Sequence, residues 1–214
     1  MLCEGETAKM PIREMGPGDI PEVVAIHLES FPGFFLSFLG PKFLALLYAG
    51  VMDHPQGLVL VSESASGIEG FVAGVTDQSG FYKRLIKKRV HRFAWASFGA
   101  VVRRPRVAPR LIRALGQSRR SEESAAKASL MSIAVRPGTS GKGAGRQLVS
   151  AFNAALADRG VREYCLTTDR DANDRVNEFY RRLGFRLAGS FVTPEGRAMN
   201  EYVMTLGGEK ISNP

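Results

Sequence analysis

The sequence predicts a single α/β domain in which short apolar strands alternate with amphipathic helices. The 214 residues are enough for one domain with its own hydrophobic core. Hydrophobic residues make up 44% of the chain and charged residues 23%, which is typical of a globular protein and excludes a disordered one. Apolar runs of strand length recur between segments whose apolar side chains have helical spacing.

The first 79 residues predict a strand, three helical segments and a hairpin. In order, we expect a strand over Pro11–Met15, a helix from about Ile20 capped by Asp19, helical pieces over Phe34–Leu39 and Lys42–Ala49, and strands over Gly57–Ser64 and Ile68–Thr76. Gly70 and Gly74 inside the last strand predict a bulge or a close approach of another backbone. The aromatic residues between Phe31 and Tyr48 are expected to pack mainly in the core, and some to line an acceptor pocket.

A basic segment, Gly80–Lys127, differs from the rest of the chain. It holds 14 Lys and Arg against 2 Glu, although the whole chain has a net charge of only +8. Its apolar residues trace one helical face, namely Leu85, Ile86, Val90, Phe93, Ala94 and Val101, and its cations fall on the other. We expect a helical insertion whose apolar face is covered by the domain or by a second copy in a homodimer. The cations could face water, anionic lipid or an acidic substrate, and nucleic acid is less favoured.

Targeting signals and redox chemistry are not indicated. No apolar run reaches the length of a membrane span, and residues 1–10 carry charges in place of an apolar signal core. Cys3 and Cys165 form no disulfide or metal pattern. These features predict a cytoplasmic protein, peripheral at a membrane if the basic segment binds lipid, with no metal.

A glycine-rich loop at residues 130–148 joins a predicted strand to a predicted helix. Leu130–Val135 is an apolar run that Pro137-Gly138 ends, and one helical face follows, made of Leu148, Val149, Phe152 and Leu156. The loop itself contains Ser140, Gly141, Lys142, Gly143, Ala144, Gly145 and Arg146. Glycines let backbone amides approach an anion, and the helix N-terminus adds N–H groups and partial positive charge. The loop therefore predicts an anion site.

Two common phosphate motifs do not fit this loop. A P-loop counted from Gly138 would need Lys at 144 and Ser or Thr at 145, where the chain has Ala and Gly, and the dinucleotide fingerprint would need glycine at 146, where it has Arg. The loop instead resembles the pyrophosphate loop of the GCN5-related N-acetyltransferases (GNAT), Val-x-Pro followed by Gln/Arg-x-x-Gly-x-Gly/Ala. Val135 and Pro137 match its first part and residues 140–145 its second, with Ser140 where Gln or Arg is usual.

A second stretch, Asn173–Phe185, resembles the second GNAT signature, Asn-x-x-Ala-x-x-x-Tyr-x-x-x-Gly-Phe. Asn173, Tyr180, Gly184 and Phe185 match, and Val176 takes the small apolar position. We expect a strand over Glu163–Thr168 before it, a helix with Val176, Phe179, Tyr180 and Leu183 on one face, and strands over Phe185–Val192 and Ala198–Leu206 after it. The resemblance implies a GNAT-like fold, a mixed and mostly antiparallel sheet flanked by helices.

The resemblance also implies acetyl-CoA as the donor substrate, bound where the strands ending near Val135 and Asp169 separate. Backbone amides of Ile133, Ala134 and Val135 would orient the thioester and pantetheine, and the loop amides would bind the pyrophosphate. Tyr180 would donate to the departing sulfur, and Asn173 would contact pantetheine or cap its helix. No general base stands out among the carboxylates placed at element ends, which are Asp77, Asp169, Glu29 and Glu63.

Two functions from different classes are consistent with these features. The first is an enzyme that moves an acetyl group to a primary amine of a small molecule by direct attack in a ternary complex. The second is an acyl-CoA-binding sensor or scaffold whose basic segment binds nucleic acid or an anionic membrane. Tyr180 favours the enzyme, because a protein that only binds acyl-CoA does not need an acid for the thiolate.

Overall fold

The computed structural model describes residues 10–79, 81, 84–85, 91–96, 124–139 and 143–207. Seven strands form one sheet in the order β1-β2-β3-β4-β5-β7-β6. The strands are β1 (Ile12–Glu14), β2 (Gly57–Ser64), β3 (Gly67–Val75), β4 (Ala128–Val135), β5 (Glu163–Asp169), β6 (Arg186–Val192) and β7 (Ala198–Thr205). All neighbours are antiparallel except β4 and β5, which are parallel. The predicted mixed, mostly antiparallel sheet is confirmed.

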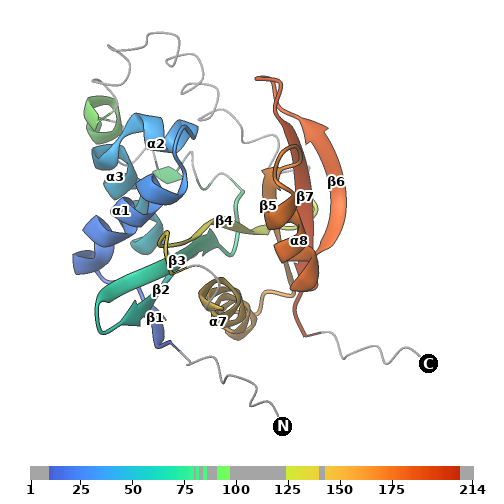
Figure 1. Cartoon of the computed structure of the whole chain (residues 1–214), viewed down its shortest axis with the longest axis horizontal. Coiled ribbons are helices and arrows are strands. Elements are labelled where there is room, and N and C mark those ends of the chain that lie inside the picture. Colours follow the sequence, from blue (N-terminus) through green and yellow to red (C-terminus); the bar gives the residue numbers. More distant parts are fainter. Residues whose placement is uncertain are drawn as a thin grey trace.

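The helices divide between the two faces of this sheet (Figure 1). They are α1 (Ile20–Ser30), α2 (Phe35–Leu39), α3 (Pro41–Met52), α7 (Ala144–Asp158) and α8 (Asp174–Arg182). Helices α1 to α3 pack on one face, to which β2 contributes Val59 and Val61. Helices α7 and α8 pack on the other face, to which β2 contributes Leu58 and Leu60. This division follows from the strand geometry, because successive side chains of a strand point to opposite faces.

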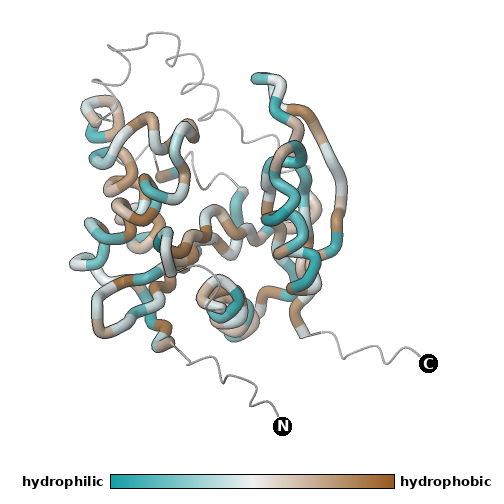
Figure 2. The backbone as a smooth tube through the Cα atoms, in the orientation of Figure 1, coloured by the Kyte–Doolittle hydropathy of each residue, from teal (hydrophilic) through white to brown (hydrophobic). Residues whose placement is uncertain are grey.

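Helix α7 confirms the predicted apolar stripe. Leu148, Val149, Phe152 and Leu156 are all buried, and Gly160 beyond the helix has a φ of +74°, which favours glycine. Helix α8 differs from its prediction: Val176 is 37% exposed, and Asn177 is buried with Tyr180. Figure 2 shows that α8 is mostly hydrophilic. The helical period places residues 173, 177, 180 and 184 toward the sheet, which leaves Val176 in solvent.

Asp19 precedes α1 as predicted, but its side chain makes no capping bond to that helix. Its carboxylate accepts the Gly16 N–H at 2.7 Å and pairs with Arg13 at 2.6 Å. The guanidinium bonds from Arg13 hold the pKa of Asp19 below its ordinary value. Asp19 therefore ties β1 to the turn before α1.

Most of the predicted basic segment lies outside the described residues. Within it, Phe81, Arg84, Leu85 and residues 91–96 are helical. Leu85 and Phe93, two residues of the predicted apolar face, are buried, and the Phe93 ring contacts Phe43 of α3 at 5.1 Å between centroids. Among the described residues, no helix is long and apolar enough to cross a bilayer.

Candidate active site

The strands β4 and β5 pair over only part of their length. Their register consists of Ala128 opposite Tyr164 and Ser129 opposite Cys165, although β4 continues to Val135 and β5 to Asp169. Figure 1 shows the two strands separating beyond this short ladder. We call this region the β4–β5 divergence. It matches the separation that the sequence resemblance implied for the donor substrate.

A β-bulge in β4 accounts for the divergence. Ala73 of β3 pairs with Ser132 and Gly74 pairs with Leu130, so that Met131 is an extra residue in β4. Such a residue bends its strand and increases its twist. A Cβ on Gly74 would lie 2.5 Å from both the Ser129 carbonyl oxygen and Phe152 Cζ, so the close approach predicted for this glycine is confirmed.

The residues expected to orient the thioester follow the bulge. Ile133, Ala134 and Val135 pair with β3 on one side, through Val72, Phe71 and Gly70, and on the other side they extend past the last pair with β5. A side chain on Gly70 would clash with the Ala134 carbonyl oxygen, at 2.8 Å. In the divergence the backbone of β4 is therefore paired with β3, and the Ser30 hydroxyl of α1 also donates to the Val135 carbonyl oxygen, at 3.5 Å.

The predicted phosphate loop is described in its second half. Ser140, Gly141 and Lys142 lie outside the described residues. Gly143 immediately precedes α7 with a φ of +79°, a conformation that L side chains rarely adopt. A Cβ on Gly145 would lie 3.3 Å from Phe179 Cζ, so this glycine lets the first turn of α7 approach α8 closely. The unpaired N–H groups of that first turn are available to an anion.

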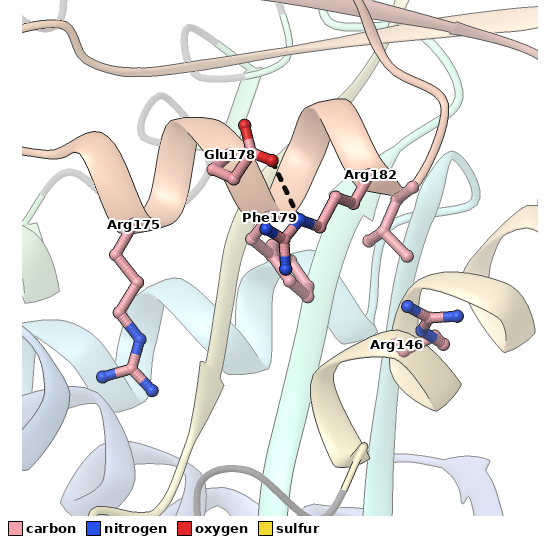
Figure 3. Close-up of a pocket in the computed structure, with 6 residues that line it drawn as sticks. Arg146, Arg175, Glu178, Phe179 and Arg182 are labelled. Carbon is pink, nitrogen blue, oxygen red and sulfur yellow. Dashed lines mark hydrogen bonds and ion pairs between the residues drawn. The ribbon is translucent and has the colours of Figure 1, made fainter.

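A pocket of about 350 Å³ lies between the start of α7 and helix α8. Its lining consists of Arg146, Arg175, Glu178, Phe179, Arg182 and Leu183. Figure 3 shows Arg146 of α7 facing the α8 side chains, with Arg182 bonded to Glu178, at 2.8 Å. Three guanidinium groups against one carboxylate make this pocket electropositive. We call it the arginine pocket.

Tyr180 lies on the buried side of α8. Its ring contacts those of Phe179, Phe185 and Tyr202, with centroid distances of 5.3, 5.3 and 6.0 Å. Burial raises the pKa of Tyr180 to about 12, so the hydroxyl keeps its proton at neutral pH. Within the described part of the chain, no side chain or backbone group hydrogen-bonds to this hydroxyl.

Asn173 occupies the position before α8 without capping it. Its side-chain amide donates to Thr168 Oγ1 at 2.9 Å and to the Asp169 carbonyl oxygen at 3.0 Å, both at the end of β5. Of the two roles predicted for Asn173, side-chain capping is therefore wrong, because its side-chain oxygen accepts no N–H of the first turn of α8. Contact with pantetheine stays a prediction.

The carboxylates considered as bases all have polar partners. Glu63 pairs with Arg13, Glu29 lies 3.7 Å from Arg136, and Asp77 accepts the Ser79 N–H. Asp169 accepts hydrogen bonds from Arg197 Nη2, at 2.6 and 2.7 Å, and from Arg197 Nε, at 3.0 Å. These contacts favour structural roles for the four groups.

Arg197 also links two distant segments next to the end of β5. Its guanidinium carbon lies 5.2 Å from the centroid of the Phe34 ring, which is 41% exposed in the turn between α1 and α2. Sequence reasoning missed this contact, because Phe34 and Arg197 are far apart in the chain. It brings the β6–β7 turn against one of the aromatic residues expected near an acceptor.

Known proteins resemble both the sequence and the fold. Residues 106–187 match a family model described as an acetyltransferase (GNAT) domain, and this range includes the glycine loop and Tyr180. These residues therefore resemble a GNAT domain. No curated protein sequence matches the chain significantly. The match confirms the expected family and supports the expected enzyme class, an N-acetyltransferase.

Solved structures of acetyltransferases share the fold of this chain at low sequence identity. An aminoglycoside 6'-acetyltransferase type Ii superimposes with a TM-score of 0.61 at 13% identity, over 94% of this chain and 99% of the other. The ribosomal-protein-S18-alanine N-acetyltransferase of Escherichia coli gives 0.54 at 15% identity, over 95% and 98%. A phosphinothricin acetyltransferase of Sinorhizobium meliloti, in complex with AcCoA, gives 0.60 at 14% identity, over 96% and 93%.

Proposed function

We propose that this protein transfers an acetyl group from acetyl-CoA to a primary amine of a small molecule, by direct attack in a ternary complex. The observation that carries the proposal is the β4–β5 divergence, which lies between a helix N-terminus suited to phosphate and a buried tyrosine with an available proton. The GNAT domain match and the AcCoA complex of one structural relative support acetyl-CoA as the donor.

The donor substrate would contact three parts of the site. Its pantetheine amides would bond to the backbone of Ile133–Val135, which lacks a β5 partner in the divergence. Its pyrophosphate would bind at the start of α7, where backbone N–H groups and the helix dipole favour anions. The arginine pocket would take the remaining phosphate and the adenosine, since guanidinium groups bind phosphate oxygens in bidentate fashion.

The reaction forms a C–N bond and breaks the C–S bond of the thioester. The neutral amine attacks the carbonyl carbon, the nitrogen loses a proton, and the coenzyme leaves as a thiolate. A thiol has a pKa of about 8.5, below that of buried Tyr180. Tyr180 therefore acts first as a hydrogen-bond donor that stabilises the developing thiolate, and complete proton transfer is the less favourable part of the step.

The acceptor would enter near Phe34, Arg197 and Asp169. Arg197 balances the Asp169 carboxylate, and the Phe34 ring offers an apolar contact beside this ion pair. The four carboxylates considered as bases all have polar partners, so we propose that water accepts the amine proton. The basic segment takes no part in acetyl transfer in this mechanism.

Binding and turnover test the proposal separately. Acetyl-CoA at 100 times its Kd should stabilise the folded protein by about 2.7 kcal/mol, because it binds only that state. This stabilisation is measured as a thermal shift. Release of free thiol against a panel of amino sugars, amino acids and antibiotics then identifies the acceptor. Absence of any thermal shift would contradict the proposal.

Gly143→Asp tests the phosphate loop in the same assay. Aspartate adds backbone strain at the positive φ and a negative charge beside the phosphate site, so the thermal shift should disappear. Gly143→Ala is the matched control, because it adds the strain without the charge, and it should keep part of the shift. Normal binding by the aspartate variant would show that the phosphate assignment is wrong.

A further inference from the structure

A buried group of amides lies beneath α8, next to the proposed site. Asn177 is only 2% exposed, and all four of its hydrogen-bonding positions are filled. Its amide nitrogen donates to the carbonyl oxygens of Asp169 and Asn173, both at 2.9 Å. Its oxygen accepts from Asn200 Nδ2 at 2.9 Å and from the Tyr202 hydroxyl at 3.0 Å. We call Asn173, Asn177, Asn200 and Tyr202 the asparagine network.

This network binds the end of β5 on its open side. The Arg170 N–H donates to the Ala198 carbonyl oxygen of β7. The Asp169 carbonyl belongs to the same planar peptide unit and therefore points away from β7, toward the side where β4 lies. There it accepts from both Asn173 and Asn177. The acceptor that could extend the β4–β5 ladder is thus already occupied by α8.

The same network fixes the position of Tyr180. Asn177 and Tyr180 are three residues apart on α8 and share its buried side. Tyr202 contributes twice, because its hydroxyl bonds to Asn177 while its ring packs against Tyr180, with a centroid distance of 6.0 Å. A shift of Asn177 would therefore move both the end of β5 and the proposed proton donor.

We propose that Asn177 is a positioning residue, which keeps the β4–β5 divergence open and holds Tyr180 at the departing sulfur. The role of Asn177 toward Tyr180 rests on the proposed function, whereas its role in keeping the divergence open does not. The GNAT signature in this chain does not include Asn177, which occupies an unspecified position between Val176 and Tyr180.

Asn177→Leu tests the role of the network in catalysis. Leucine keeps the size of the side chain and removes all four hydrogen bonds, so kcat should fall roughly 10- to 100-fold, as for other small displacements of a catalytic group. The effect should nearly vanish in a Tyr180→Phe background, because residues that act as one unit are not additive. Asn153→Leu on α7 is the matched control, since it removes the single hydrogen bond that the buried Tyr164 hydroxyl of β5 donates to an asparagine, at 2.6 Å.

Two kinetic results would overturn the proposal. One is an equal fall in kcat for Asn153→Leu, which would indicate general loosening of the protein. The other is a full effect of Asn177→Leu in the Tyr180→Phe background. If Asn177→Leu does not fold, Tyr202→Phe replaces it, because this variant removes one hydroxyl and keeps the ring against Tyr180. Tyr202→Phe should lower kcat severalfold, and this effect too should nearly vanish in the Tyr180→Phe background.

Hydrogen–deuterium exchange gives a readout that does not depend on turnover. Asn177→Leu should increase exchange in peptides covering 163–182, the end of β5 and α8, and Asn153→Leu should not. Unchanged exchange there would overturn the proposal even if an acceptor is found. Increased exchange in a protein that never transfers acetyl groups would support the open-strand role and count against the proposed function alone.

Discussion

Helices α7 and α8 lie on the same face of the sheet and line the same pocket, but different forces hold them. Helix α7 buries Leu148, Val149, Phe152 and Leu156 in the core. Helix α8 buries only Asn177 and Tyr180, and its remaining side chains are largely polar. Apolar burial is non-directional, whereas hydrogen bonds fix distance and angle. The donor's phosphates are therefore assigned to a helix held by packing, and the proton donor to one held by directional bonds.

Tyr180→Phe should show the largest effect on the α8 side. Loss of a positioned acid lowers rates by about 10²–10⁴, so kcat should fall by this order. The Kd for acetyl-CoA should change little, because the ring still packs against Phe185 and Tyr202. Steady-state kinetics and calorimetric titration measure the two quantities. Tyr164→Phe, which removes another buried hydroxyl, is the control and should keep its kcat. An unchanged rate for Tyr180→Phe would leave this tyrosine with a packing role only.

Phe152→Ala addresses the packing of α7. Its ring is fully buried and contacts Tyr164 at 5.4 Å between centroids. Removing such a ring lowers the free energy of unfolding by about 3–5 kcal/mol. Val176→Ala on α8 is the matched variant, and it should change stability by about 0.5 kcal/mol or less, as surface substitutions do. Urea denaturation measures both. Similar losses of stability in Phe152→Ala and Val176→Ala would contradict the conclusion that apolar packing holds α7 more than α8.

His27 on α1 is both buried in the core and hydrogen-bonded, and we expect it to make the stability of the protein depend on pH. It is 3% exposed, its Nδ1 is hydrogen-bonded to the Tyr48 hydroxyl at 2.7 Å, and its Nε2 has no partner among the described residues. Burial lowers the pKa of His27 from 6.5 to about 4. Between these values the unfolded chain binds more protons than the folded one, so the free energy of unfolding falls as pH decreases from 6.5 to 4.

The shift in the pKa of His27 sets the size of this loss of stability. Each pKa unit corresponds to about 1.36 kcal/mol, so the free energy of unfolding should fall by on the order of 3 kcal/mol. His27→Gln keeps a hydrogen-bonding group near Tyr48 and cannot titrate in this range. Urea denaturation at pH 7, 6 and 5 should therefore give a shallower pH dependence for the variant than for the natural protein. Parallel curves would show that His27 does not control acid stability.

Neutralising the basic segment should have the smallest effect, because that segment belongs to neither helix. Changing Lys87, Lys88, Arg103 and Arg104 to Gln should leave kcat and KM for a small amine unchanged within error. Sedimentation with anionic and neutral vesicles, in low and high salt, checks for surface binding in parallel. A large fall in kcat would place these charges in the catalytic site.

Signals that are local in the sequence predicted most of the fold. The spacing of Leu148, Phe152 and Leu156 identifies the buried side of α7 without any knowledge of its partners. Gly74 likewise indicated a close backbone approach, and the apolar run Leu130–Val135 indicated a strand. The strand order and the two-pair ladder between β4 and β5 required the structure.

Asn177 shows why part of the site could not be predicted. An asparagine on a helix normally suggests solvent exposure, and Val176 beside it suggested burial. The assignment reverses because Asn200 and Tyr202, distant in sequence, satisfy the asparagine inside the protein. The spacing of Asn173, Asn177 and Tyr180 on one helical side was the available signal. The contact of Arg197 with Phe34 had no comparable sequence signal.

The short ladder between β4 and β5 has a consequence for how the protein melts. Strands β1 to β4 and strands β5 to β7 share only two residue pairs, so they could be expected to separate as independent units. The core beneath α7, however, draws side chains from both sets, including Leu58, Val72, Leu130, Tyr164, Leu166 and Tyr202. Because neither set can be exposed without exposing the other, the two halves should unfold together in one cooperative transition with a single calorimetric peak.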